Sequence, residues 1–265
     1  MKDIISAVPA SYLEEELNDK TFFRTTNHLN NELHIITHKD APYVMDEIGR
    51  LREITFRNAG GGTGDVVDID EMDIDPDEPY KQLVLYNPRR QHIVGAYRFQ
   101  IPQKESTTTP FSMFNYFTPS QEFYDVYLPH LMELGRSFVR DEYQTREMGR
   151  ESMFALDNLF DGLGGLMDKH ADVKYFNGKV TLYNQYPQDA RDYLYAFFNW
   201  FFRDTQGLLT PKEDYEFKEN IGYKQAGSLF GTDYEKARKH LQVKMKEMGT
   251  TIPPLIKNIW IYLLL

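Results

Sequence analysis

The segment 131–139 places a carboxylate and a guanidinium three residues apart in an otherwise apolar run, with Gly135 between them. Side chains alternate between the two faces of a regular strand, so Glu133 and Arg136 would point to opposite sides. Glycine inside a strand often marks a bulge, and one extra residue here would turn both side chains to the same side. The segment therefore predicts a polar site beside a kinked strand, with a structural salt bridge as the alternative.

Two further arginines interrupt apolar patterns. Arg52 lies in the middle of the apolar face of a helix predicted over residues 43–57. Arg98 occupies an apolar-face position of a strand predicted over residues 92–101. A buried guanidinium needs an anion or another hydrogen-bonding partner. We expect both arginines to find such partners inside the fold, unless their side chains extend to the surface.

Carboxylates that could pair with these arginines gather in residues 65–78, which hold eight acids and no basic side chain. Asp70 and Asp73 are the candidates. A calcium loop is an alternative, although the glycine at the centre of such a loop is absent, and a solvated acidic loop is another. The glycine-rich run 58–64 lacks the Lys-Ser/Thr of a phosphate-binding loop. Apart from the calcium alternative, we expect no metal site.

Composition excludes several classes of protein. The chain has no cysteine, which excludes disulfides, cysteine–zinc sites and a thiol nucleophile. The formal net charge is −10, so contact with nucleic acid is not expected, because phosphate neutralisation requires a basic surface. No basic region precedes an apolar run at the N-terminus, so we expect no signal peptide and a cytoplasmic location. The apolar stretch 255–265 has about half of the ~20 residues of a transmembrane helix. It predicts a buried element, with peripheral membrane contact as the alternative.

The elements that must position these residues follow from periodicity and turn residues. In chain order they are a helix at 10–20, a strand at 32–37, a helix at 43–57, a hairpin of strands at 82–87 and 92–101, a strand at 131–139, a helix at 149–163, a strand at 174–183 and a helix at 188–204. The chain beyond residue 207 is charged and helical to residue 246. This order predicts an α/β (α+β) fold, a mixed sheet with helices on both faces. We place one domain over residues 1–206 and a C-terminal helical extension over residues 207–265.

Five short patterns recur in a fixed order over about residues 45–205. They are Leu51-Arg52 with Phe56, Ile69-Asp70-Glu71-Met72-Asp73, Gly95-Ala96-Tyr97-Arg98, Glu133-Leu134-Gly135-Arg136 and Tyr175-Phe176-Asn177-Gly178-Lys179-Val180-Thr181. Together they resemble the patterns of the acyl-homoserine-lactone synthases and of the ornithine-lipid and glycine-lipid N-acyltransferases, a branch of the GNAT superfamily. The stretch 47–53, the glycine run 60–64 and the segment 251–255 resemble the glycine-lipid enzymes most.

The resemblance implies a GNAT-like fold with a mostly antiparallel sheet. It implies transfer of a (3-hydroxy)fatty acyl group from a carrier thioester to the amine of a small amino acid, glycine or ornithine, in aminolipid biosynthesis. No bound cofactor is expected, and an acyl-carrier-protein or coenzyme A thioester would be the co-substrate. The shared polar site of the branch corresponds here to Arg52, Phe56, Asp70, Asp73, Arg98, Glu133 and Arg136.

Two departures from the branch are visible. The lactone synthases carry a tryptophan in the loop after the phenylalanine, where this chain has its glycine run. This difference argues against adenosylmethionine as a substrate. Glycine-lipid enzymes continue well past the Ile-Pro-Pro-Leu motif, whereas this chain stops ten residues after it. The sequence therefore predicts a truncated or divergent C-terminus.

Direct attack of the amine on the thioester is the simplest scheme, because no nucleophilic cysteine is available and no Ser–His–Asp spacing stands out. Glu133 would accept the amine proton, directly or through a water. Backbone N–H groups at the Gly135 bulge would hold the carbonyl oxygen. Arg136 or Arg98 would bind the carboxylate of the amino acid.

The acyl donor would lie between the strands 131–139 and 173–183. The phosphopantetheine phosphate would meet the start of the helix near Gly149, where free N–H groups favour an anion. Arg146 and Arg150 would assist and could also attract an acidic carrier protein. Alternatives to this function are a lactone synthase, an acetyl-CoA-dependent N-acetyltransferase, a non-catalytic binding module on the same fold, and a calcium-binding protein built on residues 65–78.

Overall fold

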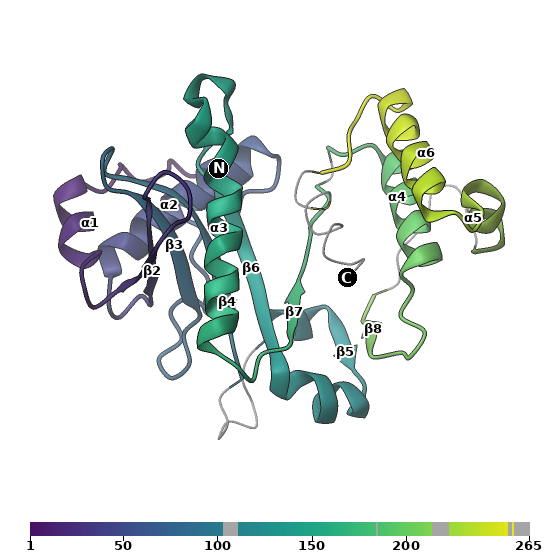
Figure 1. Cartoon of the computed structure of the whole chain (residues 1–265), viewed down its shortest axis with the longest axis horizontal. Helices are drawn as coiled ribbons and strands as arrows, with labels where there is room; N and C mark the ends of the chain where they lie inside the picture. Colours follow the sequence, from purple (N-terminus) through teal and green to yellow (C-terminus); the bar gives the residue numbers. More distant parts are fainter. Residues whose placement is uncertain (103–110, 184, 214–222, 254–255, 257–265) are drawn as a thin grey trace. The chain divides into compact units, whose positions relative to one another are not determined.

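A computed structural model describes residues 1–102, 111–183, 185–213, 223–253 and 256. The chain divides into two compact units, which are coloured along the sequence in Figure 1. The first comprises Met1–Asn115 and Tyr124–Lys179, and the second comprises Tyr116–Phe123 and Val180–Leu265. All of the site residues predicted from the sequence belong to the first unit.

The first unit is built on a six-stranded sheet with the order β1-β2-β3-β4-β6-β7. Its strands are β1 (Phe22–Thr25), β2 (Glu32–Ile36), β3 (Lys81–Asn87), β4 (His92–Gln100), β6 (Leu131–Val139) and β7 (Tyr175–Gly178). Every neighbouring pair is antiparallel except β6 and β7, which are parallel. The predicted mixed, mostly antiparallel sheet is confirmed, and β1 is a strand that the sequence analysis did not predict.

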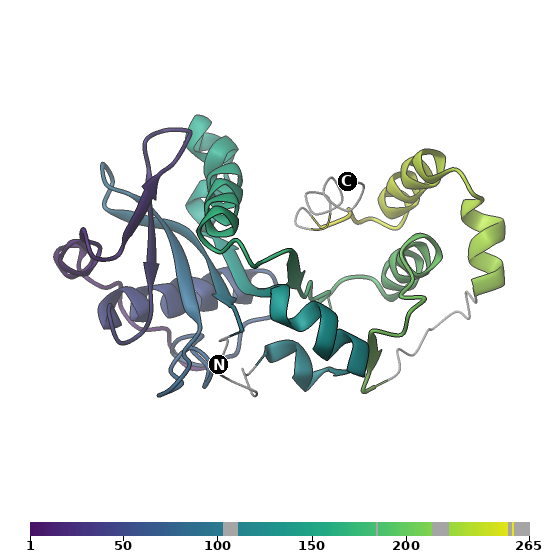
Figure 2. The ribbon, with the colours of Figure 1, turned by 60° about the horizontal axis from the view of Figure 1, so that its bottom comes forward.

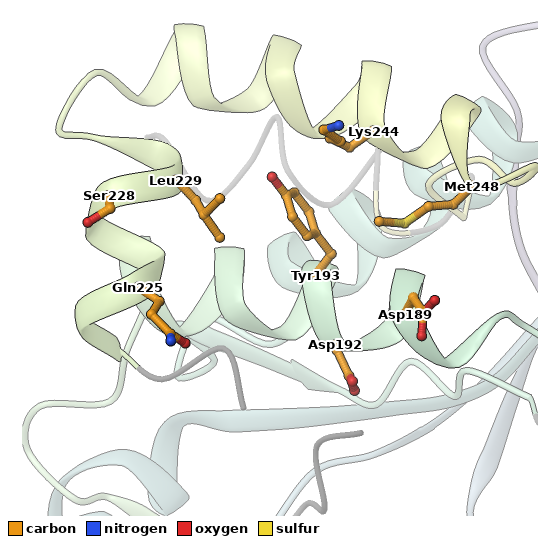
Figure 3. Close-up of a pocket in the computed structure, with 8 residues that line it drawn as sticks. All are labelled: Asp189, Asp192, Tyr193, Gln225, Ser228, Leu229, Lys244 and Met248. Carbon is orange, nitrogen blue, oxygen red and sulfur yellow. The ribbon is translucent and has the colours of Figure 1, made fainter. Parts of the chain in front are cut away.

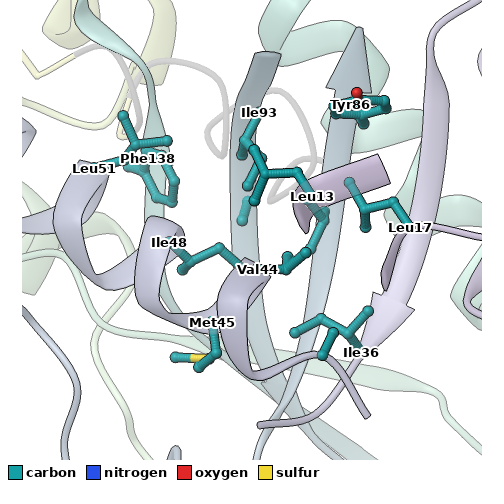
Figure 4. Close-up of a cluster of buried hydrophobic side chains, with 13 residues drawn as sticks. Leu13, Leu17, Ile36, Val44, Met45, Ile48, Leu51, Tyr86, Ile93 and Phe138 are labelled. Atoms are coloured by element: carbon teal, nitrogen blue, oxygen red, sulfur yellow. The ribbon is translucent and has the colours of Figure 1, made fainter. Parts of the chain in front are cut away.

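One face of this sheet is covered by α1 (Ala10–Glu16) and α2 (Pro42–Asn58). Proline stands in the first turn of α2. It has no backbone N–H, but the N–H groups of the first turn have no partner within the helix, so no hydrogen bond is lost. Figure 4 shows the apolar side chains of both helices packed on the strands, and its labelled residues are Leu13, Leu17, Ile36, Val44, Met45, Ile48, Leu51, Tyr86, Ile93 and Phe138. Arg52 follows Leu51 in α2 and is also buried, so it lies between α2 and this face of the sheet.

The other face is covered by α3 (Arg150–Lys169), which connects β6 to β7. Its buried side includes Leu159, Leu163 and Leu166. Gly162 lets the helix approach closely, since a Cβ built there would lie 2.8 Å from Leu83 Cδ2. A helix between two adjacent parallel strands is the usual crossover connection. The predicted helices on both faces are therefore confirmed.

Three predicted elements differ from the structure by four residues or more. The helix at 10–20 ends at Glu16, and the helix at 149–163 continues to Lys169. The strand predicted at 174–183 is only four residues long, because β7 pairs with β6 along Leu131–Leu134 and the pairing then ends. Five short helical turns connect the longer elements, at Ser112–Asn115, Phe123–Tyr127, Leu128–His130, Asp141–Gln144 and Arg146–Met148.

The second unit contains α4 (Gln188–Phe201), α5 (Tyr223–Phe230) and α6 (Tyr234–Glu247), together with the short antiparallel pair of β5 (Phe117–Pro119) and β8 (Leu209–Pro211). The aromatic stripe of α4 supplies its core, with Phe197 completely buried. Because α4 packs on α5 and α6, the compact units change over at residue 180 rather than at the boundary of 206 and 207 expected from the sequence. Most of the apolar stretch 255–265 lies outside the described residues.

Candidate active site

The kink predicted in the strand around Glu133 is present in β6. Arg98 of β4 lies opposite Gly135, whereas Ala96, two residues earlier, lies opposite Phe138. One residue of β4, Tyr97, thus lies opposite two residues of β6, Arg136 and Ser137, which is a bulge. Arg136 provides the left-handed backbone of the bulge with φ of +47°. A side chain in this region is strained by about 1–3 kcal/mol, so surrounding contacts must hold it there.

Three aspartates from the loop before β3 hold the guanidinium groups at the bulge. Arg136 Nη2 lies 3.3 Å from Asp68 Oδ1 and 3.2 Å from Asp70 Oδ2. Arg98 Nη1 lies 2.6 Å from Asp70 Oδ1 and 3.3 Å from Asp73 Oδ2. Asp70 therefore bridges the arginines of two neighbouring strands.

Arg52 joins the same network from α2. Its guanidinium is completely buried and donates to Asp73 Oδ2 at 3.0 Å and to Gln82 Oε1 at 2.6 Å. Gln82 Nε2 donates in turn to Asp73 Oδ1 at 2.9 Å. The three side chains form a closed ring of hydrogen bonds. Asp73 in this ring is the anionic partner that a buried arginine requires.

The charges of this network shift the pKa values of its carboxylates in opposite directions. Burial would raise the pKa of Asp70, but Arg98 and Arg136 outweigh burial and lower it to about 2. Burial raises the pKa of Asp68, against the opposing effect of Arg136 and Arg52. Asp70 is thus held as the anion between two cations, while Asp68 is the less stabilised carboxylate of the cluster.

A second polar cluster surrounds Glu133, which is 1% exposed. Its carboxylate accepts hydrogen bonds from the hydroxyl of Tyr80, from Ser112 N at 2.7 Å, from Ser112 Oγ at 3.0 Å and from Met113 N at 2.7 Å. Burial and the neighbouring Glu133 raise the pKa of Tyr80, so this hydroxyl stays a donor. The Arg98 guanidinium lies 4.8 Å from the centre of the Tyr80 ring and links the two clusters.

The sequence analysis missed five residues of these clusters: Asp68, Tyr80, Gln82, Ser112 and Lys179. Lys179 was quoted within a family pattern without being assigned a role, and its Nζ donates to Ser112 Oγ at 2.8 Å. For Asp68, its position in the acidic run 65–78 was the available signal. Nothing in the local pattern around Tyr80 or Ser112 indicates a contact with Glu133.

Phe56 lies apart from these polar contacts. It is partly buried and packs against the apolar cluster between α2 and the sheet. Of the seven residues that correspond to the shared polar site of the branch, the structure brings Arg52, Asp70, Asp73, Arg98 and Arg136 into one network. Glu133 belongs to the adjoining cluster around Tyr80.

Gly135 is uncrowded within the described part of the chain. Apart from its chain neighbours, a Cβ built on Gly135 would meet one described atom within 4 Å, Nε of Arg98 at 3.7 Å, which is an ordinary contact. This Nε is buried and has no hydrogen-bond acceptor among the described residues. On the other side of β6, strand pairing with β7 ends at Leu134 and Gly178, although β6 continues to Val139. An anion placed over Gly135 would supply the acceptor that Arg98 lacks.

The predicted phosphate-binding residues lie at the start of α3. Gly149 precedes the helix with φ of +55°, and no described side chain caps its first turn. Arg146 and Arg150 flank this helix start and are exposed. Glu151 in the first turn is neutralised by Arg90, whose Nε lies 2.8 Å from its carboxylate. The helix start therefore offers uncapped N–H groups and two exposed cations.

A cavity of about 500 Å³ lies within the second unit (Figure 3). It is lined by Asp189, Asp192, Tyr193, Gln225, Ser228, Leu229, Lys244 and Met248. None of these residues was predicted to take part in chemistry, and none belongs to the two polar clusters. We therefore place the candidate active site at the bulge of β6 and not in this cavity.

Comparison with known proteins agrees with this fold. The family model of the acetyltransferase (GNAT) domain matches residues 51–151, which include β3, β4, β6 and their arginines. No solved structure matches the chain. The sheet, the bulge and this match define an acyltransferase of the GNAT type, as the sequence patterns predicted.

Two curated relatives identify the branch. A glycine N(alpha)-acyltransferase of Phocaeicola vulgatus is 42% identical over 264 residues, which cover 97% of this chain and 79% of the relative. A glycine N(alpha)-acyltransferase of Bacteroides thetaiotaomicron is 42% identical over 261 residues, which cover 97% of this chain and 77% of the relative. The chain belongs to this family of GNAT-type N-acyltransferases, and the predicted resemblance to the glycine-lipid type is confirmed.

Proposed function

We propose that this protein transfers a long-chain fatty acyl group from an acyl carrier protein to the amine of glycine. The observation that carries the proposal is the Nε of Arg98, which is buried and has no acceptor among the described residues, beside the uncrowded position of Gly135. The names of the two relatives support glycine as the acceptor. A long-chain N-acyl amino acid combines an apolar tail with a carboxylate, so the product would be a membrane aminolipid.

The acceptor carboxylate would bind to the free edge of Arg98. Asp70 and Asp73 already contact Nη1 of Arg98. The other edge of the guanidinium, formed by Nε and Nη2, could donate two parallel hydrogen bonds to the carboxylate of the ligand. Asp70 also holds Arg136, whose Nε is buried and lacks an acceptor within the described chain. The aspartates thus orient two cations toward a small anion, and the Cβ missing at Gly135 leaves room for it.

The acyl thioester would enter where β6 and β7 separate. Beyond Leu134, the backbone of β6 is not paired with β7, and the bulge adds donors that could hold the developing carbonyl oxygen. The start of α3 would bind the phosphate of the phosphopantetheine arm. Exposed Arg146 and Arg150 would complement the negative surface of an acidic carrier protein.

Glu133 remains the predicted proton acceptor of the reaction, with a restricted route. Its two oxygens already accept hydrogen bonds from Tyr80, Ser112 and Met113. Because it is also buried, a proton would reach it along one of these hydrogen bonds rather than by direct contact with the amine. The hydroxyl of Ser112 could pass on the proton, because a hydroxyl can accept one hydrogen bond while it donates another.

The test is product formation by the purified protein. A 3-hydroxyacyl carrier protein is offered with glycine, ornithine or adenosylmethionine, and acetyl coenzyme A is offered with the same acceptors in parallel. We expect N-(3-hydroxyacyl)glycine, detected by mass. An acetylated product, a lactone, or no product with any acceptor would contradict the proposal.

A further inference from the structure

Lys179 lies where the active-site strands separate. Leu134 of β6 pairs with Gly178 of β7, and the next residues of the two strands are Gly135 and Lys179. Lys179 Nζ donates to Ser112 Oγ at 2.8 Å, and Ser112 Oγ donates to a Glu133 oxygen at 3.0 Å. The lysine therefore contacts the Glu133 cluster from the residue that follows the last pair of β6 and β7, next to Gly135 in the register of the strands.

The surroundings of Lys179 favour its neutral amine. Burial is the largest cause that lowers its pKa, and the cations Arg98 and Arg136 lower it further. The carboxylates of Glu133 and Asp70 oppose this shift without reversing it. Among the described residues, these four groups from β4, β6 and the acidic loop have the largest charge effects on Lys179. Lysines act as general bases in proteins when such effects make the neutral form accessible.

The carboxylates nearby are less suited to take a proton directly from the substrate. Asp70 and Asp73 are ion-paired with arginines, and the oxygens of Glu133 are occupied by four donors. A neutral lysine, by contrast, keeps a lone pair on Nζ while one of its hydrogens bonds to Ser112. We propose that Lys179 is a catalytic residue, whose neutral Nζ removes a proton from the ammonium group of the acceptor amino acid.

The proposed step rests on the proposed function and balances as follows. Lys179 takes one proton from the ammonium, and the freed lone pair of the nitrogen forms the bond to the thioester carbon. The carbon–sulfur bond then breaks, and its electron pair leaves with sulfur. The second proton lost by the nitrogen ends on the thiolate. Lys179 passes the first proton through the hydroxyl of Ser112 to Glu133, from which it returns to solvent.

The experiment exploits the absence of cysteine from the chain. Lys179→Cys introduces the single thiol, and alkylation with 2-bromoethylamine converts it to S-aminoethylcysteine. This side chain has the length of lysine and an amine of lower intrinsic pKa. We expect Lys179→Cys to lose about 100-fold or more in kcat. Aminoethylation should restore activity, with the acidic limb of the pH–rate profile moved to lower pH than in the wild type.

Two further variants separate catalysis from structure. Lys179→Arg keeps a cation that can donate to Ser112 but cannot become neutral, so it should fold normally and lose activity as Lys179→Cys does. Lys174→Cys, an exposed position next to β7, is the matched control and should respond neither to substitution nor to alkylation. Wild-type kcat in Lys179→Arg, or an unmoved acidic limb after aminoethylation, would overturn the role of Lys179. Absence of N-acylation by the wild type would instead overturn the proposed function.

Discussion

Glu133→Gln is the substitution whose outcome the structure specifies most fully. One carboxylate oxygen accepts from Ser112 N and the other from Met113 N, both at 2.7 Å. The amide group of glutamine must occupy one of these two positions. Either orientation places an NH₂ donor against a backbone N–H donor, which cannot rotate away as a hydroxyl can.

The cost of this mismatch can be estimated. A buried donor that loses its acceptor costs about 1–3 kcal/mol. The hydroxyls of Tyr80 and Ser112 can turn to accept from the new amide. With the amide nitrogen toward Met113, the N–H of Met113 is left unpaired, whereas with the amide nitrogen toward Ser112 the N–H of Ser112 keeps the Tyr80 oxygen, 2.9 Å away, as its acceptor. We expect the free energy of unfolding to fall by at most about 1–3 kcal/mol, with the fold retained. Loss of a proton acceptor would add a decrease of about 100-fold to 10,000-fold in kcat.

Both quantities are measured on the same purified variant. Urea denaturation followed by circular dichroism gives the stability, and turnover of a long-chain acyl carrier thioester with glycine gives kcat. Glu235→Gln is the matched control, because Glu235 is exposed on α6 and pairs with Arg238 at the surface. A fall of more than about 3 kcal/mol would refute the hydrogen-bond geometry assigned to Glu133. A decrease in kcat of under about threefold, with normal folding, would remove its catalytic role.

Three other perturbations follow from the same site. Gly135→Ala places a Cβ 3.7 Å from Arg98 Nε, in ordinary contact, so stability should change little while KM for glycine rises; an unchanged KM would contradict an acceptor site there. Asp70 has a folded-state pKa of about 2 against its usual 3.8, so its contribution to stability is complete above about pH 4 and is lost as pH falls toward 2; acid titration of Asp70→Asn should show a shallower loss across this range, and an identical titration would refute the ion pairs. Reversing Arg146 and Arg150 to glutamate should raise KM for the acyl carrier protein in a salt-dependent manner, and equal KM values in wild type and variant would place the carrier elsewhere.

Local patterns predicted the elements that hold a continuous apolar face. The helix over residues 43–57 and the strands around residues 84, 96 and 134 all correspond to elements of the structure, because burial on one side leaves a period in the sequence. β1 was missed since it is four residues long and none of them is fully buried. The strand at 174–183 was overextended because strand formation beyond Gly178 depends on a partner, and the pairing with β6 ends there.

The polar site was also predicted only in part. The position of Arg52 in an apolar stripe was sufficient to predict a buried guanidinium, and the acidic run was sufficient to predict carboxylates near it. The sequence did not show which residues these polar side chains contact. Arg52 contacts Gln82, Lys179 reaches Ser112, and Ser112 binds Glu133, across separations of 30, 67 and 21 residues.

The sequence by itself determined five of the six segments that form the sheet, that arginines interrupt its apolar faces, and that the strand is kinked near Gly135. Only the tertiary structure decided which donor meets which acceptor, that Arg136 rather than Gly135 takes the left-handed backbone, and that Lys179 lies at the point where β6 and β7 separate. The physical reason is one of range. Periodicity records burial of neighbouring residues, whereas a hydrogen bond depends on ångström-scale distances between segments that the fold alone brings together.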